Sequence, residues 1–162
     1  TTDRHERAEL INHFLEQFKG TLYRQTMFAE FEKITHAMAE KGEPLTWEGM
    51  NKLYRELNLK YFGDAIVVDD EIDIEWARIP HFYNAFYVYQ YATGYSAAIA
   101  LSRKILNEGQ PAVAAYLDFL SKGDSEYSID LLKGAGVDMT TAAPIENAMQ
   151  LFKELLDEFE AL

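Results

Sequence analysis

Tyrosine side chains gather in one short segment of this 162-residue chain. The segment runs from His81 to Tyr95. Half of the ten tyrosines lie in this segment, and those that recur every four residues are Tyr83, Tyr87, Tyr91 and Tyr95. On a helix, each step of four residues drifts by about 40°, so these phenols would share one stripe, whereas Tyr89 would point elsewhere. Because phenol hydroxyls donate hydrogen bonds, the stripe predicts either a ligand-binding helix face or an aromatic packing face.

His81 stands out among the four histidines of the chain. It follows Pro80, and the proline disfavours α-helical backbone at Ile79, so a break between helices is predicted there. A histidine held rigidly at such a break, beside aromatic donors, can face a ligand. His13 and His36 lie among apolar neighbours on predicted helices, so we expect them to be partly buried structural residues.

No residues of the chain form a recognisable metal site or nucleophile. His5 and Glu6 begin an H-E-x-x-H pattern, but Glu9 occupies the second ligand position, and a catalytic zinc needs three protein ligands. The acidic run from Asp64 to Glu75 lacks the glycine and the final acid of a calcium loop, so we expect solvated carboxylates. Cysteine is absent, and no G-x-S-x-G or phosphate-binding motif occurs. From these residues alone, the chain resembles a helical domain without a reaction centre.

Composition excludes other classes of function. A net charge of −12 without a basic cluster argues against binding of nucleic acid or an anionic membrane. No stretch approaches the roughly 20 apolar residues of a membrane span. At 48% hydrophobic residues the chain can bury a core. The lack of cysteine fits a cytoplasmic location.

Helical periodicity runs through nearly the whole chain and predicts an all-α, multi-helical fold in a single domain, residues 1–162. Asp3 and Thr46 are predicted helix caps, and Gly20 is expected to interrupt or loosen the first long helix. The tyrosine segment is predicted to form a helix that runs to about Asn107. The other predicted helices cover residues 47–61, 72–78, 112–121, 129–133 and 145–161.

Long runs of residues match one known family: Phe18–Glu32, Trp76–Tyr83, Phe86–Gly94, Tyr127–Lys133 and Gly136–Thr140. With these runs the chain resembles the thimet-oligopeptidase-like zinc metallopeptidases, and among them the oligoendopeptidase F group. The runs occur in the family's order and span essentially the whole chain. The resemblance implies a helical catalytic domain around a channel that admits short unfolded peptides.

In that family, zinc is held by H-E-x-x-H and by a glutamate on a following helix, which precede the part resembled here. The chain lacks these ligands and the general-base glutamate, so its metal ligands are expected to be none. The resemblance therefore implies the C-terminal portion of a zinc-dependent metalloendopeptidase. Its partners would be an oligopeptide substrate and the missing N-terminal part, and the portion alone is expected to be inactive.

The resemblance also assigns roles to residues of the tyrosine segment. In relatives, a histidine and tyrosines from it bind substrate or stabilise the oxyanion. The implied catalytic residues are His81, Tyr87, Tyr91 and Tyr95, and the implied substrate-binding residues are His81, Tyr83, Tyr87, Tyr89 and Tyr91. Tyr89 is an alternative to Tyr95, because the spacing after the histidine is slightly longer here. Arg24 and Gln25 could line the channel or make packing contacts.

Two other interpretations stay open at this point. The chain could be a free-standing acidic helical module whose tyrosine face binds a peptide or a partner helix. It could also be a domain whose exposed aromatic face is normally covered by an absent part, in which case self-association is expected.

Overall fold

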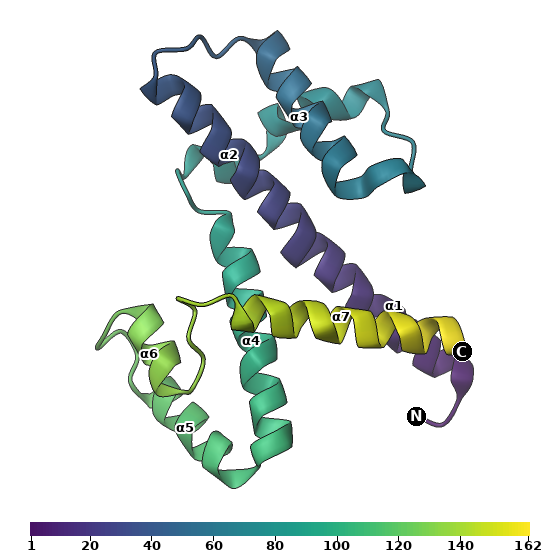
Figure 1. Cartoon of the computed structure of the whole chain (residues 1–162), viewed down its shortest axis with the longest axis vertical. Coiled ribbons are helices and arrows are strands. Elements are labelled where there is room, and N and C mark those ends of the chain that lie inside the picture. Colours follow the sequence, from purple (N-terminus) through teal and green to yellow (C-terminus); the bar gives the residue numbers. More distant parts are fainter. The chain divides into compact units, whose positions relative to one another are not determined.

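Seven α-helices, joined by loops and by short 3-10 and π segments, make up the chain, and no β-strand is present. The computed structural model describes all 162 residues (Figure 1). The α-helices are α1 (Arg4–Gln17), α2 (Arg24–Glu40), α3 (Trp47–Phe62), α4 (Tyr89–Glu108), α5 (Gln110–Ser121), α6 (Ser128–Gly134) and α7 (Ala143–Ala161). The other segments are the π-helical η1 (Phe18–Tyr23) and the 3-10 segments η2 (Gly63–Ala65), η3 (Asp70–Arg78) and η4 (Pro80–Tyr83). The prediction of an all-α fold is confirmed.

Helix starts follow the predicted caps. The Asp3 carboxylate accepts hydrogen bonds from the backbone N–H groups of His5 and Glu6, at 2.8 and 3.0 Å. The Thr46 hydroxyl accepts one from the Gly49 N–H at 3.2 Å. Each cap supplies a partner to backbone donors that the first turn of a helix leaves unpaired.

The backbone divides into two compact units. We call Thr1–Phe18 together with Thr93–Leu162 the terminal unit, and Lys19–Ala92 the central unit. One boundary falls in η1, where the helix widens around Gly20, the residue predicted to loosen it. The other boundary falls inside α4. The assignment of residues 1–162 to a single domain stays a prediction.

Regular helices build the terminal unit. Helices α1 and α7 pack against each other (Figure 1), and the Arg7 guanidinium pairs with Glu158 between them. A second group of buried side chains joins α4 to the segment around α6: Ala97, Leu101, Ala135 and Val137. Each of these helices therefore buries one apolar face and leaves charged residues at the surface.

Helix α3 packs against both α2 and η3 in the central unit. The buried core there consists of Met27, Phe28, Phe31, Tyr54, Leu57, Ile79 and Val88. Burial of Ile79 and Val88 fixes the two ends of the segment that carries His81 and the first tyrosines. No helix in either unit combines the length and the hydropathy needed to cross a membrane.

One prediction about the tyrosine segment is wrong. Helix α4 begins at Tyr89, whereas Tyr83 ends the 3-10 segment η4 and Tyr87 lies in a turn. A single helical stripe through all four tyrosines therefore does not exist. The physical reason is Phe86, whose φ of 59° puts it in the left-handed region and stops the helix from starting earlier.

Candidate active site

His81, Tyr87 and Tyr91 come together in the central unit. The Tyr91 hydroxyl lies 3.2 Å from Nε2 of His81, within hydrogen-bond distance. The His81 and Tyr87 rings stack with their centroids 5.8 Å apart and their planes 20° apart. The Tyr91 ring meets the Tyr87 ring edge-on, with centroids 5.5 Å apart. These predicted site residues therefore form one group, which we call the His–Tyr cluster.

Apolar neighbours in the sequence hold the His–Tyr cluster at the edge of the core. Ile79 precedes His81 by two positions and is 6% exposed, and Val88 directly follows Tyr87 and is 1% exposed. Phe82 packs against core aromatic rings of α2. Because these side chains point inward, His81 stays half-buried and Tyr87 stays exposed, so both keep polar atoms accessible.

A tight turn sets the position of Tyr87. Its backbone N–H donates to the carbonyl oxygen of Asn84 at 3.1 Å. Between them, the Phe86 N–H donates to a carboxylate oxygen of Glu32, on α2, at 2.7 Å. The Tyr91 N–H then donates to the Val88 carbonyl at 3.2 Å as α4 begins. This path brings the Tyr87 and Tyr91 rings together although only Tyr91 is helical.

The phenols of the cluster are suited to donate hydrogen bonds. A hydrogen bond with Tyr87, and then desolvation, raise the pKa of Tyr91 above its ordinary value. A phenol with a raised pKa keeps its proton at neutral pH. Phenol hydroxyls beside an imidazole can donate hydrogen bonds to an oxygen on which negative charge develops, such as that of an attacked carbonyl.

A buried carboxylate fixes the segment that leads to His81. Glu75, in η3, is 5% exposed. It accepts hydrogen bonds from Arg24 at 2.5 Å, from the Tyr54 hydroxyl at 2.6 Å, and from Arg78. Burial, and then the hydrogen bond to Glu75, raise the pKa of Tyr54. Arg24 therefore makes a packing contact that, with Tyr54, ties η3 to both α2 and α3. Because Arg24 also lines a hollow, its expected place in the channel stays a prediction.

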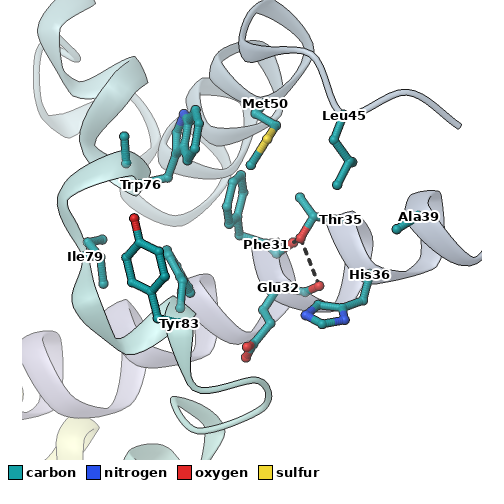
Figure 2. Close-up of a pocket in the computed structure, with 12 residues that line it drawn as sticks. Phe31, Glu32, Thr35, His36, Ala39, Leu45, Met50, Trp76, Ile79 and Tyr83 are labelled. Carbon is teal, nitrogen blue, oxygen red and sulfur yellow. Dashed lines mark hydrogen bonds between the residues drawn. The ribbon is translucent and has the colours of Figure 1, made fainter.

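A pocket of about 320 Å³ lies beside η4 in the central unit (Figure 2). Its walls are mostly apolar and come from α2, α3 and η3–η4: Phe31, Met50, Trp76, Ile79 and Phe82 are among them. Tyr83 lines the same pocket and is 84% exposed. Such a hollow is large enough to accept an apolar side chain of a ligand.

The remaining predicted site residues, Tyr89 and Tyr95, differ in their surroundings. Tyr89 is 51% exposed at the first position of α4. Tyr95 belongs to the terminal unit, where its ring meets Phe18 edge-on at 5.2 Å. Its hydroxyl is buried without a hydrogen-bond partner, and burial raises its pKa. The roles assigned to Tyr83, Tyr89 and Tyr95 stay predictions.

The other histidines are placed differently from one another. His13 is exposed, so its expected partial burial is wrong: its side chain lies on the solvent side of α1 and meets Gln17 at 3.0 Å. His36 is half-buried as expected, with its ring centroid 4.5 Å from that of Phe86. Sequence reasoning gave no role to Glu32, which the structure places next to the cluster's turn. The sequence carries no local signal for this role, because Glu32 lies 54 residues from Phe86 and only the folded structure brings the two together.

No group of three or more histidine, aspartate or glutamate side chains is arranged to hold a metal ion. The residues of this chain therefore do not fit a zinc site. What the His–Tyr cluster offers is hydrogen-bond donors.

Comparisons with known proteins agree on one family. The sequence pattern of peptidase family M3 matches residues 1–151. Oligopeptidase PepF of Bacillus subtilis (strain 168) is 60% identical over 160 residues, which are 99% of this chain and 24% of that protein. The chromosomal oligoendopeptidase F of Lactococcus lactis subsp. cremoris is 46% identical over 162 residues, 100% of this chain and 27% of that protein.

A solved structure gives the same result. The crystal structure of oligoendopeptidase-F from Enterococcus faecium matches with a TM-score of 0.96 and 52% sequence identity, covering 99% of this chain and 31% of that chain. The chain thus spans about a quarter of the length of the two relatives above.

Proposed function

The chain belongs to peptidase family M3, and on that premise we propose that it supplies part of the active site of a zinc-dependent endopeptidase of short oligopeptides. The observation that carries the proposal is the His–Tyr cluster. Its hydroxyl and imidazole groups converge within hydrogen-bond distance at the accessible edge of an apolar core. Family membership alone would not say which residues of this chain take part.

The proposed role of the cluster is to stabilise charge. When water attacks a peptide carbonyl, the oxygen becomes negatively charged, and donors positioned for that charge lower the barrier. Tyr87 and Tyr91 are the proposed donors. The edge-on contact between their rings limits how either phenol can turn, so the donors are positioned before the substrate arrives.

The proposed role of His81 is to orient Tyr91 and to bind substrate. When hydrogen is on Nε2, the imidazole donates to the Tyr91 oxygen across the 3.2 Å contact. The phenol hydrogen of Tyr91 is then not needed for His81, and it can turn from Tyr87 to the substrate oxygen when substrate binds. Stacking on Tyr87 keeps the imidazole plane in place.

Tyr95 is proposed as a further donor on a separate observation. A buried hydroxyl without a partner is uncommon in a folded protein and calls for an explanation. An oxygen of a bound ligand would supply the missing partner. For Tyr83 and Tyr89 we propose substrate contacts, since both are exposed and Tyr83 also lines the apolar pocket.

Zinc is proposed as the cofactor of the complete enzyme, with every ligand outside this chain. Accordingly, we propose that the 162 residues alone do not hydrolyse peptides. The other proposed partners are an oligopeptide substrate and the remaining part of the enzyme, with no nucleic acid or membrane. The proposed location is the cytoplasm.

A chimaera tests the proposal. In it, this chain replaces the matching residues of the Bacillus subtilis oligopeptidase PepF, which supplies the rest of the protein. We expect the chimaera to cleave a short quenched peptide, to lose that activity with a chelator, and to regain it with added zinc. The isolated 162-residue chain should show no cleavage.

The opposite results are equally informative. Cleavage by the purified isolated chain would contradict the proposal that the zinc ligands lie outside these 162 residues. A folded chimaera that lacks peptidase activity would contradict the function itself and favour the acidic helical binding module.

A further inference from the structure

The turn that carries Tyr87 has an unusual backbone. Phe86 is the only residue other than glycine with a positive φ, and its value of 59° lies in the left-handed region. A residue with a Cβ adopts this conformation at a cost in free energy, and such strain persists only when surrounding contacts impose it. The contacts that impose it here come from a distant part of the chain.

Helix α2 supplies contacts to both the backbone and the ring of Phe86. The Glu32 carboxylate accepts the Phe86 N–H at 2.7 Å, and the His36 ring lies 4.5 Å from the Phe86 ring between centroids. Glu32 and His36 are one helical turn apart and therefore share a face of α2. Figure 2 shows both side chains extending from that face, with the carboxylate directed away from Thr35 and Leu45.

Glu32 is also a buried charge, because the residue is only 4% exposed. A carboxylate taken out of water needs compensating hydrogen bonds, and a bond from an N–H to a charged acceptor is stronger than one between neutral groups. The Phe86 N–H provides one such bond. Burial of this acid on α2 therefore has a specific consequence at the turn.

We propose that Glu32 is a positioning residue for the His–Tyr cluster: it holds the Phe86 N–H and thereby sets where Tyr87 lies. Tyr87 is the next residue, and the buried Val88 fixes the far side of the turn, so Tyr87 is held between two anchors. Glu32 also lines the apolar pocket, but the role proposed for it is to hold the turn. The expected effect on catalysis rests on the proposed function. The anchoring of the turn by Glu32 does not depend on it.

The test uses the chimaera with Glu32→Ala and Glu32→Gln, and with Glu30→Gln as the matched control. Glu30 lies on the same helix and bonds Lys60 and Tyr61 of α3 instead of the turn. Hydrogen–deuterium exchange of a peptide spanning residues 84–88 reports the anchor. Values of kcat and KM for a short quenched peptide report its effect on the cluster.

For Glu32→Ala we expect exchange in the turn to rise about 10- to 100-fold, which is what the loss of a hydrogen bond to a charged group gives. We expect kcat to fall on the order of 10- to 100-fold with KM nearly unchanged, because a displaced donor weakens transition-state binding. Glu32→Gln keeps an oxygen acceptor but replaces a charged acceptor by a weaker neutral one, so most of kcat should be restored while exchange confined to the turn stays several-fold faster than in wild type. Glu30→Gln should leave both unchanged.

Several outcomes would overturn the inference. Unchanged exchange of the turn in Glu32→Ala would show that Glu32 does not anchor it. A changed turn with wild-type kcat would show that the anchor does not position Tyr87. If Glu32→Ala exchanges rapidly throughout, Glu32→Gln decides: it should show faster exchange confined to the turn, and control-like exchange there would contradict the anchor. If the chimaera shows the expected exchange but no peptidase activity, the result supports the anchoring of the turn by Glu32 and contradicts the proposed function.

Discussion

The central and terminal units are both helical, but they distribute charge and backbone irregularity differently. In the central unit, the carboxylates of Glu32 and Glu75 are buried, and 3-10 segments and a left-handed residue lead into the His–Tyr cluster. In the terminal unit, ion pairs such as Lys153–Asp157 lie at the surface and the helices are regular. The irregular features therefore gather around the His–Tyr cluster.

This difference shows how a helical chain can build a binding site. A regular helix can place side chains only at intervals set by its own period. Bringing Tyr87 against Tyr91 and His81 requires backbone that leaves the helix, and buried polar contacts hold that backbone in place. In the terminal unit, the proposed donor Tyr95 lies within the regular helix α4, so amphipathic packing is enough.

The largest effect on stability should come from Glu75. Replacing it by alanine removes the shared partner of Arg24, Tyr54 and Arg78 and leaves the buried Tyr54 hydroxyl unpaired. We expect Glu75→Ala to lower the free energy of unfolding by about 3–5 kcal/mol. The corresponding change in the terminal unit, Glu154→Ala, breaks a more exposed pair and should lower it by less than about 1 kcal/mol.

Urea unfolding of the 162-residue chain, followed by circular dichroism, measures both changes. Equal losses for Glu75→Ala and Glu154→Ala would show that burial of charge does not distinguish the units.

Removing single hydroxyls should distinguish the His–Tyr cluster from a packing tyrosine of the terminal unit. In the chimaera, Tyr87→Phe or Tyr91→Phe removes a proposed donor and should lower kcat on the order of 10²- to 10³-fold without unfolding the protein. Tyr116→Phe, in the terminal unit, removes a hydroxyl from a ring that stacks on Phe119 and should leave kcat unchanged. Steady-state kinetics with a quenched peptide measure all three, and wild-type turnover in both cluster variants would refute their assignment.

Loss of a helix cap should lower the free energy of unfolding by a similar amount in both units. Asp3 caps α1 of the terminal unit and Thr46 caps α3 of the central unit, both by accepting backbone N–H bonds. We expect Asp3→Ala and Thr46→Ala each to lower the free energy of unfolding by about 1 kcal/mol. Thermal and urea unfolding of the two variants test this, and a cap effect confined to one unit would show that the difference extends beyond buried charge.

The smallest effect should be a pH dependence in the terminal unit. Hydrogen bonds from Thr140, and then from Lys133, lower the pKa of Asp138 to about 2 in the folded chain. The ionised carboxylate therefore stabilises the fold above the unfolded pKa of about 3.9, and this contribution is lost as the pH falls toward about 2.

Asp138→Asn should remove this part of the acid sensitivity. Melting temperatures of wild type and variant, measured across this pH range, should converge as the pH falls. Parallel curves for the two proteins would exclude the contribution.

Sequence reasoning found the local features of both units and missed the long-range ones. Asp3 and Thr46 could be identified as caps because a cap acts within one helical turn. His81 could be singled out because Pro80 restricts the backbone next to it. The helix start at Tyr89 was missed because it depends on Phe86, whose conformation is supported by Glu32 from another helix.

The same limit applies to the cluster itself. A helical stripe predicted the contact between Tyr87 and Tyr91 for the wrong reason, since only Tyr91 lies on α4. The stacking of His81 on Tyr87 depends on burial of Ile79 and Val88 in a core formed mainly by α2 and α3. Periodicity within one segment carries no information on such packing.

Inhibition by a phosphinic peptide tests the central claim most directly, because its tetrahedral oxygens mimic the attacked carbonyl. In the chimaera, Tyr91→Phe should raise the inhibition constant by the same factor by which kcat/KM falls, on the order of 10²- to 10³-fold, with KM little changed. An unchanged inhibition constant, with or without a fall in kcat, would contradict the assignment of the His–Tyr cluster as transition-state donors.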